Sequence, residues 1–387
     1  MLRQMVDQNS FSANRAGVNA LGRFTAAQFA PLGFAAEYVP SANPALGDHL
    51  VLSRPGRGTA TVGMISHLDT VYPPEEEQRQ QFVWRPVGDR IYGPGTLDIK
   101  GGTVLMHLVL AGLRQVAPAV FDETTWVLLL NSSEEVLSPD FGLLCCARLA
   151  GARAALVFEC GARVGEELTV VTARKGRAVF RCQVEGRGAH AGGDHDRGAN
   201  AIVQLAETVR HLAAVTDYTR ARTVNVGTIT GGTVVNRVPH RASAELEMRA
   251  FSAEDYEAGK AAILALNGPG TVRAASDGYP CRVRVELLAE TPPWPRNAAT
   301  ERLFRLWQDT AARLGLRLAR EERGGLSDAN LIWQAVPTLD GLGPLGDNTH
   351  CSEQSADGTK EQEYVEVSSF VPKATLNAMA LLELLRD

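Results

Sequence analysis

The sequence lacks the long apolar runs and basic blocks that mark membrane proteins and nucleic-acid-binding proteins. No run of about eighteen apolar residues occurs in the 387-residue chain, so we expect no membrane-spanning helix. The first thirty residues contain no apolar core of signal-peptide length, which favours a cytoplasmic protein. Because the formal net charge is −5 and no block is rich in Lys and Arg, we expect no binding to nucleic acid and none to an anionic membrane.

Two further absences concern covalent chemistry. The six cysteines form no C-x-x-C pair and are too sparse for a disulfide framework, so we expect free thiols that pack in the interior. No G-x-S-x-G elbow is present. Only Cys351 has an adjacent histidine, His350, and adjacent side chains of an extended chain point to opposite sides. The sequence therefore gives little support to a covalent nucleophile.

The composition and the first half of the chain indicate a layered globular fold. Hydrophobic residues make up 45% and charged residues 21%, and the length favours two domains. Short apolar runs over 60–66, 125–131 and 154–159 lack clean alternation, as in strands that are buried on both faces. Helical patterns cover 102–116 and 141–149. This order predicts an α/β fold with a mostly parallel sheet.

A different pattern follows in the middle of the chain. Leu168–Ala173 and Ala178–Glu185 are expected to be adjacent strands, and the segments after them predict an α+β module with a four-stranded sheet and two helices on one face. Pro292–Pro295 indicates a hinge, because proline stiffens a linker. The expected strands of the module are 178–185, 223–230, 241–248 and 282–287, and its helices are 198–214 and 253–266.

The chain is therefore expected to be one α/β domain interrupted by an inserted α+β domain. After the hinge, a helix over 300–314, a strand over 336–339 and a helix over 372–385 resume the first pattern. The polar segment Ser352–Glu363 is expected to be an exposed loop. The expected parts are 1–172 for the first part of the α/β domain, 173–291 for the insert and 292–387 for the second part.

Acidic and imidazole side chains follow the predicted strands of the α/β domain. His67 comes directly after the strand that ends at Ser66, and Glu134 and Glu135 follow the strand that ends near Asn131. The carboxyl ends of parallel strands form one edge, where ligands bind, so we expect these side chains to lie close together. The same edge is expected to receive Glu159 after the third strand, Asp98 from a glycine-rich turn, and the late His350.

The charge of this set indicates a metal site. Several carboxylates in one crevice repel one another, and either protonation or cations relieve the repulsion. Imidazoles beside carboxylates suit Zn²⁺, and the number of ligands fits two ions better than one. Taken singly, each residue has an ordinary alternative, as a surface histidine, a solvated glutamate pair or a turn aspartate. The position that they share favours the metal site.

Five motifs and a late histidine occur in a distinctive order. They are SHLDT (66–70), GPGTLDIKGG (93–102), NSSEE (131–135), FE (158–159), GAHAG (188–192) and His350. In order and spacing they resemble the co-catalytic di-zinc metallopeptidases, which include glutamate carboxypeptidases, aminoacylases and succinyl-diaminopimelate desuccinylases. The resemblance covers nearly the whole chain and is strongest to the glutamate carboxypeptidase branch.

The resemblance implies two metal ions in the catalytic α/β domain. By this resemblance, His67 and Glu159 hold one zinc ion. Glu135 and His350 hold the other, and Asp98 bridges the two ions. Zn²⁺ is the expected metal, with Co²⁺ or Mn²⁺ as substitutes.

The resemblance also implies roles for residues beside the metal ligands. Glu134 is expected to be the general base, because it stays free to take a proton while Glu135 is a ligand. Asp69 is expected to fix the tautomer of His67 and to raise its basicity. The peptide bond between the bridging aspartate and Ile99 is expected to be cis.

The inserted domain resembles the lid and dimerisation domain of the family, which implies a homodimer. His190 matches the histidine that stabilises the oxyanion, often from the partner subunit. Asn236 and Arg249 match positions that bind a substrate carboxylate, although a plain surface charge is the alternative for Arg249. The loop with Gly325 and Ser327 resembles a glycine-rich pocket loop whose backbone amides hold a carboxylate.

These features predict a metallo-carboxypeptidase or amidohydrolase that hydrolyses an amide bond next to a free carboxylate, in a small peptide or an N-acyl amino acid. One alternative is a di- or tripeptide aminopeptidase. Glu159 disfavours this alternative, because peptide-trimming relatives often have Asp at that position. A second alternative is a non-catalytic, metal-dependent binder of carboxylated ligands. Glu134 disfavours this alternative, because binding alone needs no proton acceptor.

Overall fold

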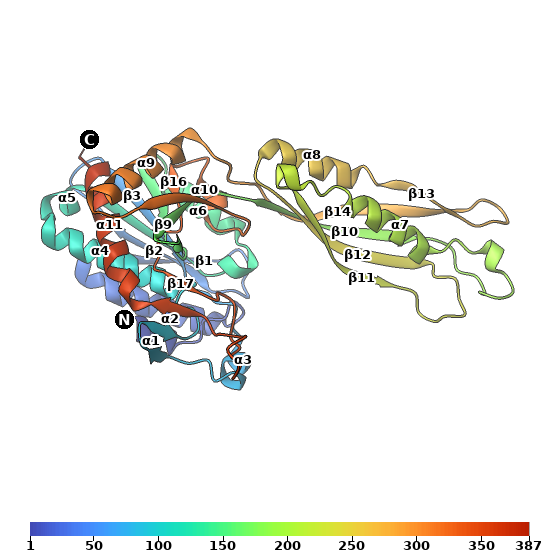
Figure 1. Cartoon of the computed structure of the whole chain (residues 1–387), viewed down its shortest axis with the longest axis horizontal. Helices are drawn as coiled ribbons and strands as arrows, with labels where there is room; N and C mark the ends of the chain where they lie inside the picture. Colours follow the sequence, from blue (N-terminus) through green and yellow to red (C-terminus); the bar gives the residue numbers. More distant parts are fainter. Residues whose placement is uncertain (387) are drawn as a thin grey trace. The chain divides into compact units, whose positions relative to one another are not determined.

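The computed structural model describes residues 1–386, and the chain divides into two compact units. Unit 1 comprises Met1–Thr172, Arg296–Glu322 and Ser327–Asp387, and unit 2 comprises Ala173–Pro295 and Arg323–Leu326. In Figure 1 the blue and red parts of the chain belong to unit 1, and the green to yellow middle belongs to unit 2. Within the described residues, no helix is both long enough and apolar enough to cross a membrane.

Unit 1 is built on a six-stranded sheet in the order β1-β2-β6-β3-β7-β16. β6, β3, β7 and β16 run parallel to one another, which confirms the predicted α/β fold. β1 and β2 add an antiparallel edge that the sequence analysis missed, because β1 is an edge strand that is exposed along most of its length. The strands are β1 Ala35–Pro40, β2 Asp48–Arg54, β3 Thr61–His67, β6 Thr125–Asn131, β7 Ala154–Val157 and β16 Thr338–Leu339.

Helices pack against this sheet and close the core of unit 1. α4 begins directly after the glycine-rich turn and packs against β3 and α11. The core buries Trp126 and Leu128 of β6 together with Trp307 of α9. The helices are α1 Leu2–Val6, α2 Arg15–Phe29, α3 Pro74–Arg79, α4 Lys100–Val116, α5 Pro118–Glu123, α6 Pro139–Arg148, α9 Ala298–Arg313, α10 Ala329–Ile332 and α11 Phe370–Leu384.

Two small sheets accompany the main sheet. Their strand orders are β15-β9-β8 and β17-β18-β5-β4. In the second sheet β17 pairs with β18, so the residues between these two strands form a loop that is closed at its base. The strands are β4 Arg85–Val87, β5 Arg90–Tyr92, β8 Ala162–Val164, β9 Glu167–Arg174, β15 Leu318–Arg323, β17 Gly346–Asp347 and β18 Tyr364–Glu366.

Unit 2 contains a five-stranded antiparallel sheet in the order β11-β12-β10-β14-β13, with α7 and α8 on one face (Figure 1). Along β10 the burial alternates: Phe180 and Val184 are buried, whereas Gln183 and Glu185 are exposed. The alternation shows which face the helices cover. The elements are β10 Gly176–Glu185, β11 Thr223–Gly231, β12 Arg241–Ala250, β13 Gly268–Arg273, β14 Pro280–Thr291, α7 Ala201–Ala213 and α8 Ala253–Leu264.

Two details of the predicted insert are wrong. The sheet has five strands and not four, because β13 begins with Gly-Pro-Gly, a composition typical of a turn that an edge strand nevertheless tolerates. β9 and β10 are also not paired with each other, since β9 lies between β15 and β8 while β10 pairs with β12 and β14. Only Lys175 separates β9 from β10, and a hairpin needs a loop of about two residues, so the chain continues from one sheet into another.

Candidate metal centre

The structure brings together the five side chains that the sequence analysis named as metal ligands, from segments that are far apart along the chain. His67 is the last residue of β3, and Glu159 lies just past the end of β7. Glu135 lies in the 3₁₀ turn after β6, Asp98 lies shortly before α4, and His350 follows β17. β6, β3 and β7 are neighbours and parallel, so their carboxyl ends form one edge of the sheet.

Asp98 lies at the centre of this cluster. Its Oδ1 is 3.0 Å from His67 Nε2, and its Oδ2 is 3.3 Å from His350 Nε2. His67 Nε2 is also 3.7 Å from Glu159 Oε1, and His350 Nε2 is 3.2 Å from Glu135 Oε2. Each oxygen of Asp98 therefore faces a different histidine, and each histidine has a second carboxylate beside it.

One buried carboxylate oxygen of the cluster has no hydrogen-bond donor among the described residues. The side chain of Glu135 is 7% exposed, whereas that of His350 is 53% exposed. Among the described residues, Oε1 of Glu135 is buried and has no hydrogen-bond partner. The carboxylate of Glu134 also makes no side-chain hydrogen bond in the part of the chain that the structure describes. Buried carboxylate oxygens without donors are destabilising, so this site needs positive charge.

Burial and neighbouring charges shift the pKa values of the cluster in opposite directions. Burial raises the pKa of Glu134 and of Glu135 above the usual value for glutamate. Hydrogen bonds with Asp98 and Glu135 raise the pKa of His350 to about 11. Burial alone would raise the pKa of Asp98, but hydrogen bonds with His350 and His67 hold it below its usual value. The carboxylates thus depend on nearby positive charge to stay ionised.

Asp69 contacts both His67 and the loop that carries Glu134 and Glu135. Its carboxylate accepts hydrogen bonds from the backbone N–H groups of Glu134 at 3.0 Å and Glu135 at 3.2 Å. It also accepts from the hydroxyl of Ser12 at 2.6 Å. His67 Nδ1 lies 2.9 Å from the backbone oxygen of Asp69 and 3.4 Å from its carboxylate. Nδ1 therefore carries the proton, which leaves Nε2 of His67 as a ligand atom.

Glu363 is a further buried acid that sequence reasoning missed, because it ends the segment that was expected to be an exposed loop. Ser352–Glu363 is exposed over most of its length, but Glu363 itself is fully buried. Its Oε1 accepts from the N–H groups of Leu97 at 2.8 Å and Asp98 at 3.0 Å, and its Oε2 accepts from the Tyr72 hydroxyl at 2.7 Å. Burial raises the pKa of Glu363 to about 7. The expectation of an exposed loop is wrong at Glu363, because the next strand, β18, pairs on both sides and places Glu363 in the interior.

The peptide bond that follows Asp98 is cis, as the resemblance implied.

Asn131 and Asp328 form a second support that the sequence analysis did not identify. Asn131 Oδ1 accepts from the N–H of Ser133 at 3.0 Å and from the hydroxyl of Ser138 at 2.7 Å. Asn131 Nδ2 donates to Asp328 Oδ1 at 2.8 Å. Burial raises the pKa of Asp328 to about 7. The two residues are nearly two hundred positions apart, and no sequence signal connects them.

In unit 2, His190 lies in a loop that fixes the orientation of its ring. His190 Nδ1 accepts hydrogen bonds from the N–H groups of Gly192 at 3.2 Å and Gly193 at 2.9 Å. Nε2 therefore carries the proton, and the exposed ring offers an N–H donor. Asn236 is exposed too, and its backbone oxygen accepts from the N–H of Ala191 at 3.0 Å, which ties the two loops together.

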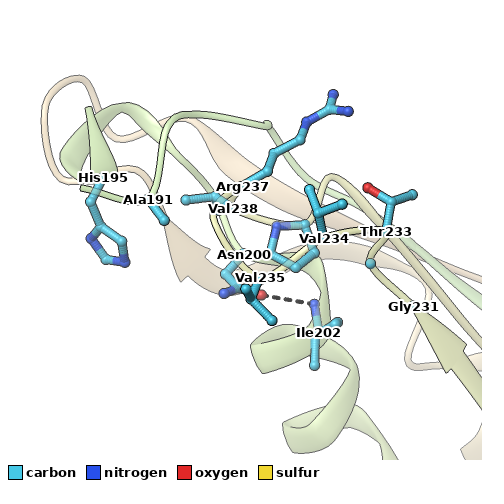
Figure 2. A pocket seen from close by; sticks show the side chains of 12 residues that line it. Ala191, His195, Asn200, Ile202, Gly231, Thr233, Val234, Val235, Arg237 and Val238 are labelled. Atoms are coloured by element: carbon cyan, nitrogen blue, oxygen red, sulfur yellow. Dashed lines mark hydrogen bonds between the residues drawn. The ribbon is translucent and has the colours of Figure 1, made fainter. Parts of the chain in front are cut away.

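A pocket of about 470 Å³ lies beside these loops in unit 2 (Figure 2). Its walls combine the polar side chains of His195, Asn200 and Arg237 with the apolar side chains of Ile202 and Val235. The side chain of Asn200 accepts from the N–H of Ile202 at 3.0 Å, the dashed line in Figure 2, and so caps the start of α7. None of the five clustered residues of unit 1 lines this pocket.

The expected substrate contacts Arg249 and Gly325 already have partners in unit 2. Arg249 Nε donates to Glu247 at 2.9 Å, and its Nη1 donates to the backbone oxygen of Gly324 at 2.8 Å. The backbone oxygen of Gly325 accepts from Arg174 at 3.1 Å. These contacts hold the segment Arg323–Leu326 in unit 2. In this structure the guanidinium of Arg249 therefore stabilises the loop that contains Gly325.

Ser327, the fourth expected contact, is buried in unit 1. Its hydroxyl donates to Asp340 Oδ2 at 2.8 Å and accepts from the N–H of Ala329 at 3.2 Å. Its own N–H donates to Asn330 Oδ1 at 3.2 Å. The hydroxyl and the N–H of Ser327 thus stabilise the turn that starts α10, and both are engaged in the structure.

Comparisons with known proteins agree with this arrangement. The family model for the peptidase dimerisation domain matches residues 172–268. Carboxypeptidase G2 of Pseudomonas sp. (strain RS-16) is 26% identical over 386 residues, which cover 99% of this chain and 88% of that protein. Aminopeptidase PepT of Bacillus cereus ATCC 10987 has a TM-score of 0.76 at 21% identity, covering 100% of this chain and 97% of that chain. The M20 family metallo-carboxypeptidase Sso-CP2 of Sulfolobus solfataricus has a TM-score of 0.72 at 15% identity, covering 99% and 98%.

The two kinds of comparison agree on the relationship. The family model falls almost entirely within unit 2, and the structural similarity spans the whole chain. The similarity to carboxypeptidase G2 confirms the resemblance that the motifs carried, including its carboxypeptidase branch. The chain is thus similar to M20 metallopeptidases along its whole length, and the protein is a hydrolase.

Proposed function

We propose that this hydrolase uses two divalent metal ions to cleave an amide bond next to a free carboxylate, as a carboxypeptidase or an N-acyl-amino-acid amidohydrolase. The observation that carries the proposal is the position of Asp98, whose two oxygens face two different histidines. The similarity to a carboxypeptidase along 99% of the chain supports the choice of reaction. The substrate is a small peptide or an N-acyl amino acid.

The donor set fits two zinc ions. Two ligand atoms that each lie about 2.0 Å from a tetrahedral zinc ion are about 3.3 Å apart. The four distances between imidazole nitrogens and carboxylate oxygens in the cluster run from 3.0 to 3.7 Å. The buried Oε1 of Glu135, which lacks a donor among the described residues, fits a metal ligand as well. We assign His67 and Glu159 to one ion, Glu135 and His350 to the other, and Asp98 to both, with Co²⁺ or Mn²⁺ as substitutes for Zn²⁺.

Glu134 is the proposed general base. When bound, the two ions polarise the amide carbonyl and lower the pKa of water. The carboxylate of Glu134 takes a proton from the attacking water and passes it to the leaving amine. Its backbone N–H is fixed by Asp69 at 3.0 Å, so the base is held in place. Burial raises the pKa of Glu134, which makes its carboxylate a stronger base.

His190 is the proposed oxyanion stabiliser. Two backbone N–H groups occupy its Nδ1, so its Nε2–H is a donor of fixed orientation. We propose Asn236 as a contact of the substrate carboxylate, since its side chain is exposed. Arg249 would take this role by exchanging the oxygen of Gly324 for a carboxylate oxygen. Gly325 and Ser327 are proposed to shape the pocket loop.

Unit 2 is proposed to join two copies of the chain into a homodimer. β11 is an edge strand and is mostly exposed, and the side chain of Ile229 on it is 59% exposed. Edge N–H and C=O groups beside exposed apolar side chains suit pairing with a second copy. The match to the peptidase dimerisation domain supports this use.

Ile229→Lys should shift the sedimentation coefficient from dimer to monomer, while Val371→Lys, at a 72% exposed position of unit 1, should leave the dimer intact. A monomeric wild type would overturn this proposal.

A substrate panel tests the reaction. The metal-loaded protein should hydrolyse N-acyl amino acids or dipeptides that carry a free carboxylate next to the scissile amide, and it should lose this activity when the carboxylate is blocked as an amide. Cleavage of carboxylate-blocked peptides with a free amino terminus would instead identify an aminopeptidase. Full metal loading without hydrolysis of any compound would identify a binding protein.

A further inference from the structure

Four consecutive backbone N–H groups of the loop that carries Glu134 and Glu135 are each bound by a side chain. Ser132 N–H donates to His49 Nδ1 at 3.2 Å, and Ser133 N–H donates to Asn131 Oδ1 at 3.0 Å. The N–H groups of Glu134 and Glu135 both donate to Asp69. The backbone of this loop is therefore positioned by side chains and not by a regular helix or strand. Of the three acceptors, His49 has no role in the reaction described above.

His49 is a buried residue of β2 that is 1% exposed. Because the N–H of Ser132 points at Nδ1, that nitrogen is unprotonated, and the proton is on Nε2. Nε2 lies 3.1 Å from Asp140 Oδ2, to which it donates. The hydroxyl of Ser132 lies 3.1 Å from Nδ1 and 2.8 Å from the backbone oxygen of Gly47. A proton on Nδ1 would face the N–H of Ser132, so the neutral Nε2–H form is the one that fits.

Asp140 anchors the other side of His49. Its Oδ2 also accepts from the N–H of Ala42 at 2.7 Å and from the hydroxyl of Ser41 at 3.2 Å. Asp140 lies in the first turn of α6, where a carboxylate is stabilised by the helix dipole. The ring of His49 packs on Phe141, with 5.1 Å between the ring centroids. The imidazole is thus fixed to α6 on one side and to Ser132 on the other.

We propose that His49 is a positioning residue for the hydrolytic reaction, which holds Ser132 so that Glu134 and Glu135 keep their places. The inference rests on the proposed function, because it concerns the same loop. His49 itself touches neither Glu134 nor a metal ligand by any hydrogen bond among the described residues. It acts through the backbone of Ser132, two residues before the proposed base.

Two substitutions separate positioning from packing. His49→Phe keeps an aromatic ring on Phe141 but removes the hydrogen bonds at both ring nitrogens, and His49→Gln keeps an acceptor and a donor. His107→Phe is the control, since His107 is a half-buried histidine of α4 whose ring packs edge-on against Phe29 at 5.2 Å. We expect H49F to lower kcat by about 10- to 100-fold with little change in KM. H49Q should recover most of the loss, and H107F should match the wild type.

A measurement that does not use activity completes the test. In histidine-labelled wild-type protein, long-range ¹H–¹⁵N NMR at neutral pH should show His49 with an unprotonated Nδ1 and a protonated Nε2. Amide exchange at Ser132 should be slow in the wild type and faster in H49F. A protonated Nδ1, or an unchanged kcat in folded H49F, would overturn the proposal. A wild type that hydrolyses nothing would overturn the proposed function. The NMR spectrum of the wild type would still test whether His49 holds Ser132. It would do so even if H49F fails to fold.

Discussion

Unit 1 and unit 2 differ in how far certain charged side chains are buried. In unit 1, Glu363 is fully buried, and the side chains of Asp98 and Glu135 are 14% and 7% exposed. In unit 2, Arg181 and Glu245 pair at 2.9 Å on the open face of the sheet, with side chains that are 39% and 48% exposed. An exposed pair contributes about 0–1 kcal/mol, whereas burial of an acid is destabilising unless hydrogen bonds or positive charge compensate it. Retention of such acids in unit 1 indicates where the chemistry lies.

The largest expected effect is the removal of metal, which should affect unit 1 alone. A chelator followed by dialysis should abolish turnover, because the carbonyl and the water are no longer polarised. Added Zn²⁺ should restore turnover and raise the melting temperature, since a ligand at about 100 times its Kd stabilises the folded state by about 2.7 kcal/mol. Activity assays and thermal unfolding measure the two results. Full turnover by protein with no detectable metal would contradict the assignment.

The next largest effect is expected for the proposed base. Glu134→Ala should lower kcat by about 10²- to 10⁴-fold and keep both metal ions, because general acid–base catalysis is lost while the ligands remain. Glu245→Ala, in the exposed pair of unit 2, is the matched control and should keep wild-type kcat. Steady-state kinetics together with metal analysis check both variants. Wild-type turnover in E134A would rule out this role.

A smaller effect is expected for the buried acid that supports Asp98. Glu363→Gln should lower metal affinity or kcat by about 10- to 100-fold, because the negative charge is lost and, while the amide oxygen accepts from the N–H groups of Leu97 and Asp98, the N–H₂ would face the Tyr72 hydroxyl. Glu361→Gln is the control, since Glu361 lies two residues earlier, is 37% exposed and pairs with Arg90. Titration with Zn²⁺ followed by calorimetry distinguishes the variants. Equal affinities for both would show that Glu363 is not a support of the site.

The smallest effect is expected for the open face of unit 2. Arg181→Ala should change the free energy of unfolding by no more than about 1 kcal/mol, because the pair with Glu245 is solvated. Metal affinity and kcat should stay at the wild-type values. Urea unfolding monitored by circular dichroism gives the free energy. A loss of zinc binding in R181A would break the contrast between the two units.

The sequence predicts those parts of the site that follow from strand ends. His67 and Glu135 could be placed together because parallel strands β3 and β6 bring their carboxyl ends to one edge, and apolar runs mark both strands. The glycine-rich turn before α4 added Asp98 to the same edge, and the order of motifs gave it the role of a bridging ligand. The helical pattern of apolar residues predicted α4 and α9 within a few residues of their observed bounds.

The parts that the sequence did not predict depend on contacts between distant segments. Glu363 lies at the end of a polar stretch, and only the hydrogen bond that it accepts from the N–H of Asp98 indicates a role. His49 lies in β2 directly before the apolar run Leu50–Leu52, but no sequence signal connects it with Ser132 or Asp140, which follow much later in the chain. β13 was not predicted as a strand because it begins with Gly-Pro-Gly. For Glu363 and β13 the local composition is typical of a surface segment, and tertiary contacts override it.

The central claim is that five side chains of unit 1 assemble a site for two divalent ions. The most direct test is the zinc content per chain, measured by mass spectrometry after loading and gel filtration of the wild type and of Asp98→Ala. We predict two zinc ions per chain in the wild type and fewer than two in D98A with unchanged circular dichroism. A wild type that retains no zinc, or a D98A variant that still retains two ions, would contradict the account.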